Sequence, residues 1–149
     1  MNAEIDAVRV GGTPQGPVPI VVLTLDEEDD VLPIFVGFEE AAAIARGLEA
    51  EDIGRPLTHD LMLDVIEELG GRVDRVVVSG VENGTYVADL HLVTPRGEAV
   101  VDARPSDSLA MASRTNADVE VDREVFEQGR REREEFAHLD DIRELEGPV

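Results

Sequence analysis

An internal repeat constrains the fold of this chain more than any other feature of its sequence. A shift of 68 residues aligns residues 5–46 with residues 73–114 without a gap, and seven of the 42 paired positions are identical. Each copy reads as strand, strand, strand, helix, and Gly16 falls on Gly84. Two copies are too few for a solenoid. The repeat therefore predicts an α+β domain of two β-β-β-α units, with antiparallel sheets packed against helices.

Local patterns predict the same order of elements. The run PVPIVVLTL (17–25) is rich in β-branched residues, as strands are, and VLPIFV (31–36) predicts a further strand. The segment FEEAAAIARGLEA (38–50) has apolar residues at helical spacing. Thr58 is a good N-cap for a second helix, HDLMLDVIEELGG.

The length of 149 residues is enough for a core without disulfides, and the sequence has no cysteine. We expect a domain over residues 1–121. From residue 122 onward charge is dense and apolar residues are widely spaced, which predicts a charged, helical tail (122–149) docked weakly on the domain. No apolar run approaches the ~18 residues of a membrane span and no secretory pattern opens the sequence, so we expect a soluble, cytoplasmic protein.

The charge of the chain is strongly negative. Thirty-four acidic residues face thirteen basic ones, all of them Arg, and the net charge is −21. Together with the missing Lys and only 3% aromatic residues, this composition is typical of halophilic proteins. At about 1 M salt the Debye length is only ~3 Å, so self-repulsion is largely screened. In dilute buffer this charge would oppose nucleic-acid binding, whereas in high salt it neither establishes nor excludes it.

One copy of the repeat is polar where the other is apolar. If TPRG (94–97) is a tight turn, Asp89 lies opposite Asp102, and His91 shares their face of the hairpin. Opposed carboxylates repel each other unless a cation or an Arg lies between them. These residues are therefore candidate ligands of Mg²⁺ or Mn²⁺. A solvated sheet face in an acidic protein explains the same pattern without any site.

A second polar cluster lies where a predicted strand meets the helix that follows it. Its members are Asp102, Arg104, Ser106 and Asp107. Capping of that helix is a sufficient explanation for Ser106 or Asp107, and a second role stays open. In the helix after Thr58, Asp60 in the first turn complements the helix dipole.

The hairpin of the first copy is apolar on both faces. Ile20, Val22 and Phe35 fall on one face, and Val21, Leu23 and Ile34 fall on the other. A sheet that is apolar on both sides must be covered on both sides. We therefore predict a subunit interface there and a homo-oligomer, with a dimer favoured.

Three segments in register resemble the bifunctional nuclease domain family. They are LPIFVGFEEAAAIARGLE, RPLTHDLMLDVIEELGGRVDRVVV and VDARPSDSLAMASRTNA, and the resemblance covers about residues 5–121 in the order and spacing of the family. It implies a small α+β domain with duplicated strand-rich halves, a tendency to form homo-oligomers, and cleavage of both RNA and DNA. Ser108 stands where relatives usually have Ala.

The resemblance also implies a set of site residues. From RPLTHD these are Arg55, Thr58, His59 and Asp60, and from DARPSD they are Asp102, Arg104, Pro105, Ser106 and Asp107. In a nuclease, His59, Asp60, Asp102 and Asp107 would be catalytic, with His59 as general base or acid. Arg55, Arg104 and Ser106 would bind the substrate. A divalent metal, Mg²⁺ or Mn²⁺, would be held by Asp102 with Asp89 or Asp107.

A non-catalytic reading fits the composition equally well. In it the chain is an oligomeric module that binds a small anion or a protein, and the two motifs form a structural network. The chain has no basic track for nucleic acid, and P-loop, dinucleotide-binding, nucleophile-elbow and HExxH motifs are absent from its sequence. The two readings differ in whether RPLTHD and DARPSD converge on one open cleft.

Overall fold

The structure is a computed structural model that describes residues 1–50 and 55–145. The first repeat contains β1 (Asn2–Thr13), β2 (Gly16–Leu25), β3 (Val31–Phe35) and α1 (Phe38–Glu49). After α2 (Thr58–Glu68), the second repeat contains β4 (Arg72–Glu82), β5 (Thr85–Thr94), β6 (Gly97–Ala103) and α3 (Pro105–Ala112). The chain continues through β7 (Asp118–Val121), α4 (Arg123–Gly129), α5 (Glu134–Ala137), β8 (Asp140–Asp141) and α6 (Ile142–Leu145).

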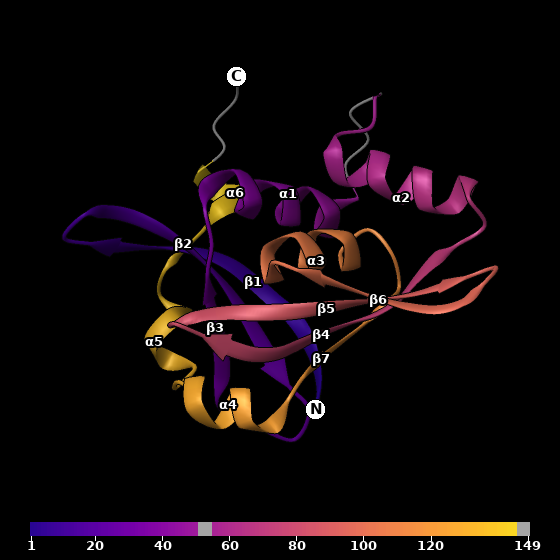
Figure 1. The fold of residues 1–149 in the computed structure, drawn as a ribbon. Coiled ribbons are helices and arrows are strands. Elements are labelled where there is room, and N and C mark those ends of the chain that lie inside the picture. The colour runs from indigo at the N-terminus through magenta and orange to yellow at the C-terminus, as the bar shows by residue number, and fades with distance from the viewer. Residues whose placement is uncertain (51–54, 146–149) are drawn as a thin grey trace.

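The α+β class and the duplicated β-β-β-α order are confirmed (Figure 1). Within each repeat the strands form an antiparallel meander, β1-β2-β3 and β4-β5-β6. The equivalent glycines of the first turns, Gly16 and Gly84, both have positive φ, at 114° and 78°. Glycine adopts this conformation without steric cost, which explains its presence in both copies.

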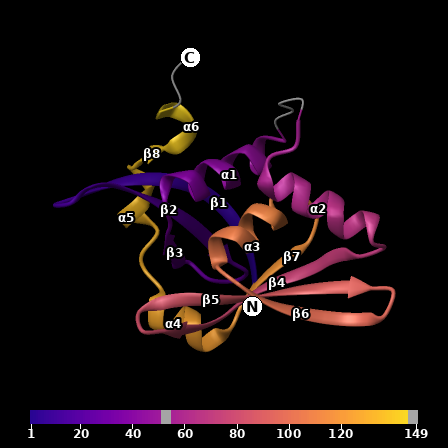
Figure 2. The same cartoon turned by 45° about the horizontal axis from the view of Figure 1, so that its top comes forward.

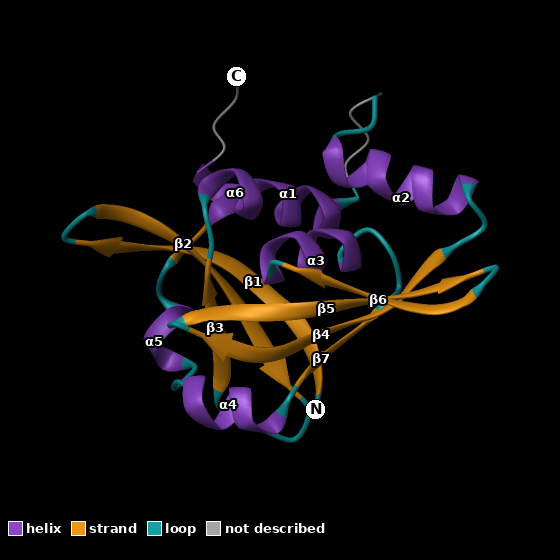
Figure 3. Cartoon of the chain, in the orientation of Figure 1, coloured by secondary structure: helices purple, strands orange, loops and turns teal. Residues whose placement is uncertain are grey.

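The two meanders form one sheet, in the order β3-β2-β1-β7-β4-β5-β6, with β8 paired to β1 (Figure 3). The four residues of β7 run antiparallel to β1 and parallel to β4. The prediction of antiparallel sheets therefore holds within each repeat, while the junction between them includes a parallel pair. No helix in the described ranges is both long and apolar enough to cross a membrane.

Helices α1 and α3 pack together on the sheet. Their core residues are small or aliphatic, among them Ala41, Ile44, Leu109 and Ala110. A close approach is possible because Gly47 of α1 has no side chain. A Cβ at this position would lie 2.8 Å from the Cβ of Ser113 and would overlap its hydroxyl.

The C-terminal segment covers the second face of the first meander. Phe136 of α5 and Leu139 pack on Ile20 and Val22, which are 4% and 3% exposed. The predicted subunit interface at this face is therefore wrong for Ile20 and Val22, because the chain itself covers them; Phe35 remains exposed. The segment is also not a weakly docked helix, since Phe126 of α4 is fully buried in the main core and β8 extends the sheet.

We predict that Gly47→Ala destabilises the protein, because the new methyl group forces α1 and α3 apart. Overpacking of this kind costs about 1–3 kcal/mol, and alanine regains roughly 1 kcal/mol as the better helix former. Urea unfolding in molar KCl, followed by circular dichroism, measures the net loss. Gly12→Ala is the control, because a Cβ there meets nothing within 4 Å. Equal effects of the two substitutions would contradict the role of the close approach.

Candidate active site

A groove of about 1050 Å³ lies between α1, the start of α2, α3 and strands β5 and β6. Its apolar lining includes Ala43, Leu90, Val101 and Met111. Its charged lining consists of Glu39, Glu40, Arg46, His59, Asp102, Arg104 and Asp107. The groove thus combines an apolar surface with charges of both signs.

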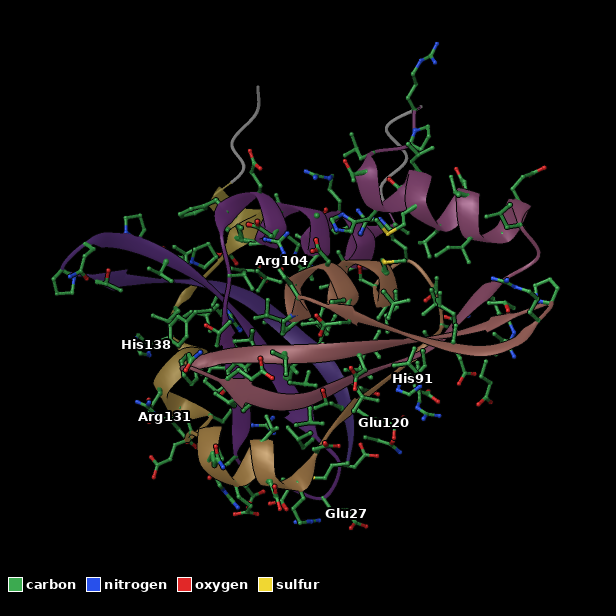
Figure 4. All side chains as sticks on the ribbon, viewed as in Figure 1. Glu27, His91, Arg104, Glu120, Arg131 and His138 are labelled. Atoms are coloured by element: carbon green, nitrogen blue, oxygen red, sulfur yellow. The ribbon has the colours of Figure 1, made fainter. Side chains whose placement is uncertain are left out.

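The two sequence motifs meet in this groove. His59 Nε2, from RPLTHD, lies 3.0 Å from Asp107 Oδ1, from DARPSD. Arg104 donates to both oxygens of the same carboxylate, at 2.8 Å from Nε and 3.2 Å from Nη2. Its Nη1 also lies 3.4 Å from Glu40 Oε1 of α1. Figure 4 shows Arg104 between α1 and α3. The two motifs therefore converge on one groove, although His59 and Asp107 are 48 residues apart in sequence.

Asp107 is the centre of this network. Burial raises the pKa of its carboxyl, but hydrogen bonds from Arg104 and His59 and the charge of Arg104 outweigh burial, so the pKa lies below its ordinary 3.8. An ionised carboxylate only accepts hydrogen bonds, and Nε2 of His59 must therefore carry the proton that it donates. Nδ1 is then the ring nitrogen that can exchange a proton with a ligand.

The helix starts differ from the predicted caps. α2 begins at Thr58 with Leu57 as its N-cap, so the prediction of Thr58 as the cap is wrong by one residue. α3 begins at Pro105 with Arg104 as its N-cap, and neither Ser106 nor Asp107 caps it. Pro105 fixes the first turn without needing a backbone donor, which makes a side-chain cap less necessary. Asp107 is thereby free to bind Arg104 and His59.

Asp60 has a positioning role outside the groove lining. Its Oδ1 accepts a 2.7 Å hydrogen bond from Arg114 Nε, and its Oδ2 accepts one from the backbone N–H of Leu57. Burial raises the pKa of the Asp60 carboxyl, but these two hydrogen bonds and the charge of Arg114 outweigh burial, so the pKa lies below its ordinary value. Arg114, only 8% exposed, also donates to Ala110 of α3. The pair therefore fixes α2, and with it His59, relative to α3.

Two predicted substrate-binding residues do not reach the groove. Arg55 is exposed ahead of α2 and lies outside the lining. Ser106 is 7% exposed and lines a smaller cavity of about 350 Å³ beside Arg104. Thr58 does line the groove, near His59.

The hairpin register at the predicted metal face is confirmed. Asp89 of β5 lies opposite Asp102 of β6, and His91 lies opposite Val100. Asp102 also lines the groove, whereas Asp89 and His91 do not. No group of three His, Asp or Glu side chains in the described residues could hold a metal ion. Asp107 is a poor candidate ligand, because its two oxygens already accept three hydrogen bonds and the positive charge of Arg104 at 2.8 Å repels a cation.

Some groove residues were not predicted from the sequence. Buried polar atoms without a hydrogen-bond partner in the described residues include Arg46 Nε and Ser108 Oγ, and both residues line the groove. The repeat offered a signal for one of them, since Arg46 aligns with Arg114. Glu40, the second partner of Arg104, carried no such signal.

Comparison with known proteins gives the family of the chain. The bifunctional nuclease domain model matches residues 21–134, from β2 to the start of α5 and past the predicted domain end at residue 121. The chain belongs to the bifunctional nuclease domain family. Both motifs of the groove lie inside the matched range.

The chain is also similar to two mycobacterial proteins. They are the uncharacterized proteins MT1877 and Rv1829 of Mycobacterium tuberculosis, strains CDC 1551 and H37Rv. Each is 40% identical over 110 residues, which cover 74% of this chain and 65% of the relative. The alignment thus spans slightly under two thirds of each relative's length.

We predict that Asp107→Asn weakens the fold only above acidic pH. A carboxyl whose pKa is lower in the folded than in the unfolded state stabilises the fold above its unfolded pKa, here 3.8, and this contribution is lost as the pH falls through the folded pKa. The melting temperature of the variant should be lower by roughly 2–4 °C at neutral pH, and the difference should shrink as the pH falls below 3.8 and through the lowered pKa of the folded state.

Differential scanning calorimetry in molar KCl, repeated over a pH series, measures this difference. Asp29→Asn, at an exposed position between β2 and β3, is the control. A difference that persisted unchanged into strong acid would show that Asp107 acts through packing and not through its charge.

Proposed function

We propose that this protein is a nuclease that hydrolyses phosphodiester bonds of RNA and DNA in the groove between α1, α2 and α3. The contact between His59 and Asp107 carries the proposal, because it joins two distant motifs at an open groove. Membership of the bifunctional nuclease domain family supports it.

His59 is the proton-exchanging residue in this proposal. Asp107 holds the ring by its Nε2 proton, which leaves Nδ1 as the base. A water molecule attacks phosphorus, the bond from phosphorus to the leaving oxygen breaks, and the proton of the water passes to Nδ1. The leaving oxygen takes a proton from solvent or from the imidazolium. Asp107 orients the imidazole by accepting the hydrogen bond from Nε2, as an acidic partner does in other His-based sites.

Arg104 and Arg46 are the groups that bind the phosphate. The Arg104 side chain is 65% exposed at the groove, and its guanidinium has donors beyond those used by Asp107 and Glu40. Arg46 Nε has no hydrogen-bond partner in the described residues. A guanidinium binds phosphate oxygens in pairs, which fixes the orientation of the scissile bond.

A divalent metal, Mg²⁺ or Mn²⁺, remains part of the proposal at Asp89 and Asp102 only. These opposed carboxylates form a two-residue pair next to the groove. A bound ion would relieve their repulsion and polarise a phosphate oxygen. Two ligands favour a weakly held ion, and the proton transfer assigned to His59 does not depend on it.

One observation favours the second candidate, a non-catalytic binding module. The groove lining has four carboxylates, Glu39, Glu40, Asp102 and Asp107, against two arginines. Arg104 is already neutralised by Asp107 and Glu40. Such a groove suits a small ligand with an apolar part better than a long polyanion. In that case Asp107, Arg104 and His59 bind the ligand but transfer no proton.

We predict that His59→Ala lowers kcat for cleavage by about 10²–10⁴-fold, the range expected for loss of a general acid or base. The assay uses fluorescent single-stranded RNA and DNA in molar KCl, with Mg²⁺, Mn²⁺ or EDTA. His138→Ala, on the exposed end of α5 and far from the groove (Figure 4), is the matched control and should keep full activity.

Three outcomes separate the readings. Cleavage that His59→Ala loses and His138→Ala keeps supports the nuclease. Equal traces of cleavage in all three proteins indicate a contaminating nuclease and favour the binding module. If EDTA abolishes cleavage and Asp89→Asn/Asp102→Asn does the same, the metal belongs to the carboxylate pair.

A further inference from the structure

The smaller cavity beside Arg104 is continuous with the groove, and we call it the side cavity. It has a volume of about 350 Å³ and lies between the end of β3 and the starts of α1, β5 and α3. Glu40, Thr85, Tyr86 and Arg104 line both the side cavity and the groove. A ligand with a phosphate at Arg104 in the groove can therefore extend into the side cavity.

The side cavity contains aromatic surface, which is scarce in this protein. The chain has four Phe, one Tyr and no Trp, and two of these residues, Phe35 and Tyr86, line the side cavity. Phe35 is 61% exposed. The Tyr86 hydroxyl lies against Gly129, the last residue of α4, where a Cβ would overlap it. Figure 2 shows the start of β5 beside α4, so the C-terminal segment holds this aromatic wall in place. Aromatic side chains bind nucleobases by stacking.

Two polar side chains complement the apolar part of the lining. The Glu40 carboxylate is 25% exposed, and its Oε1 has one long contact of 3.4 Å with Arg104. Its Oε2 lies against Gly37, where a Cβ would overlap it, so the missing side chain of Gly37 makes room for the carboxylate. Ser106 is 7% exposed and does not cap α3. The side cavity thus offers a carboxylate that accepts hydrogen bonds and a hydroxyl that can donate one.

We propose that the side cavity binds a guanine base, with the phosphate next to that base held by Arg104. Guanine presents two adjacent donors on one edge, N1–H and the N2 amino group, and a carboxylate can accept from both. The O6 acceptor beside them suits the Ser106 hydroxyl. Adenine, cytosine and uracil each present a single donor group on the same edge, so they match Glu40 less well.

A guanine ligand also accounts for a carboxylate next to the phosphate-binding cation. Glu40 repels a phosphate, but a neutral base that donates two hydrogen bonds to it adds no negative charge. The inference rests on the proposed function, because it names the base that lies beside the cleaved phosphate. It adds a base preference that the nuclease activity itself does not require.

The positions of cuts in random-sequence RNA and DNA single strands, mapped in molar KCl, test this inference. Wild type should cut next to guanine about tenfold more often than next to another base, always on the same side of it, since a bidentate hydrogen-bonded pair gives discrimination of this order. Glu40→Gln should remove most of this preference. Ser106→Ala should reduce it while the ion pair of Arg104 with Glu40 stays intact.

Glu68→Gln is the matched control, because it removes the same charge from an exposed residue of α2 that lines neither the side cavity nor the groove. It should keep the guanine preference, and circular dichroism checks that each variant is folded. Cleavage by wild type without a base preference would overturn the inference and leave the nuclease intact. A guanine preference that Glu40→Gln and Ser106→Ala both keep would also overturn it, because the base would then be recognised elsewhere.

Binding of GMP, AMP, CMP and UMP, measured by ligand-observed NMR, separates the inference from the proposed function. If wild type cleaves no strand, the nuclease fails. GMP that then binds about tenfold more tightly than the other three nucleotides, and loses this advantage in Glu40→Gln, still supports a guanine site. Equal binding of the four nucleotides, or no binding, by a protein that cleaves nothing would overturn the inference as well.

Discussion

The short strand β7 holds the two halves of this molecule together. Its residues pair antiparallel with the start of β1 and parallel with β4, so that Val119 lies between Ala3 and Val76. The N-terminal amine of Met1 donates a hydrogen bond to the carbonyl of Val121, and the backbone N–H of Val121 donates one to the carbonyl of Met1. Because β7 joins two meanders that otherwise do not share a strand, it also sets the distance between their helices. The close packing of α1 on α3, and hence the groove, depends on this junction.

The chemistry of the groove follows from how the Arg104 guanidinium is held. Arg104 is bound by Asp107 and by Glu40 from the other repeat, so it is positioned before any ligand arrives. Such preorganisation lowers the cost of orienting a phosphate, although the neighbouring carboxylates reduce its attraction for a long polyanion. Asp107 serves both Arg104 and His59, and a single carboxylate thereby aligns a cation with a proton-exchanging ring.

Local sequence signals predicted those features that depend on neighbours along the chain. The turn TPRG and strict alternation gave the pairing of Asp89 with Asp102, because a tight hairpin fixes its own register. The predicted helix caps, Thr58 for α2 and Ser106 or Asp107 for α3, were wrong. Cap propensity favours Ser, Thr and Asp, whereas the N-cap residues are Leu57 and Arg104. The tail was misjudged for a related reason. Its apolar residues are sparse, yet Phe126 and Phe136 fill gaps that only the folded sheet creates.

The sequence by itself determined the duplicated α+β architecture, the polar hairpin of the second repeat and the two motifs of the site, because periodicity and turn chemistry act over short distances. Only the tertiary structure decided that His59 meets Asp107 and that Asp60 binds Arg114, contacts that span 48 and 54 residues. It also decided which apolar surface stays open. The C-terminal segment covers Ile20 and Val22, while Leu61, Val65 and Leu69 at α2 stay at least half exposed. Such contacts depend on how elements pack, and packing is a property of the whole chain.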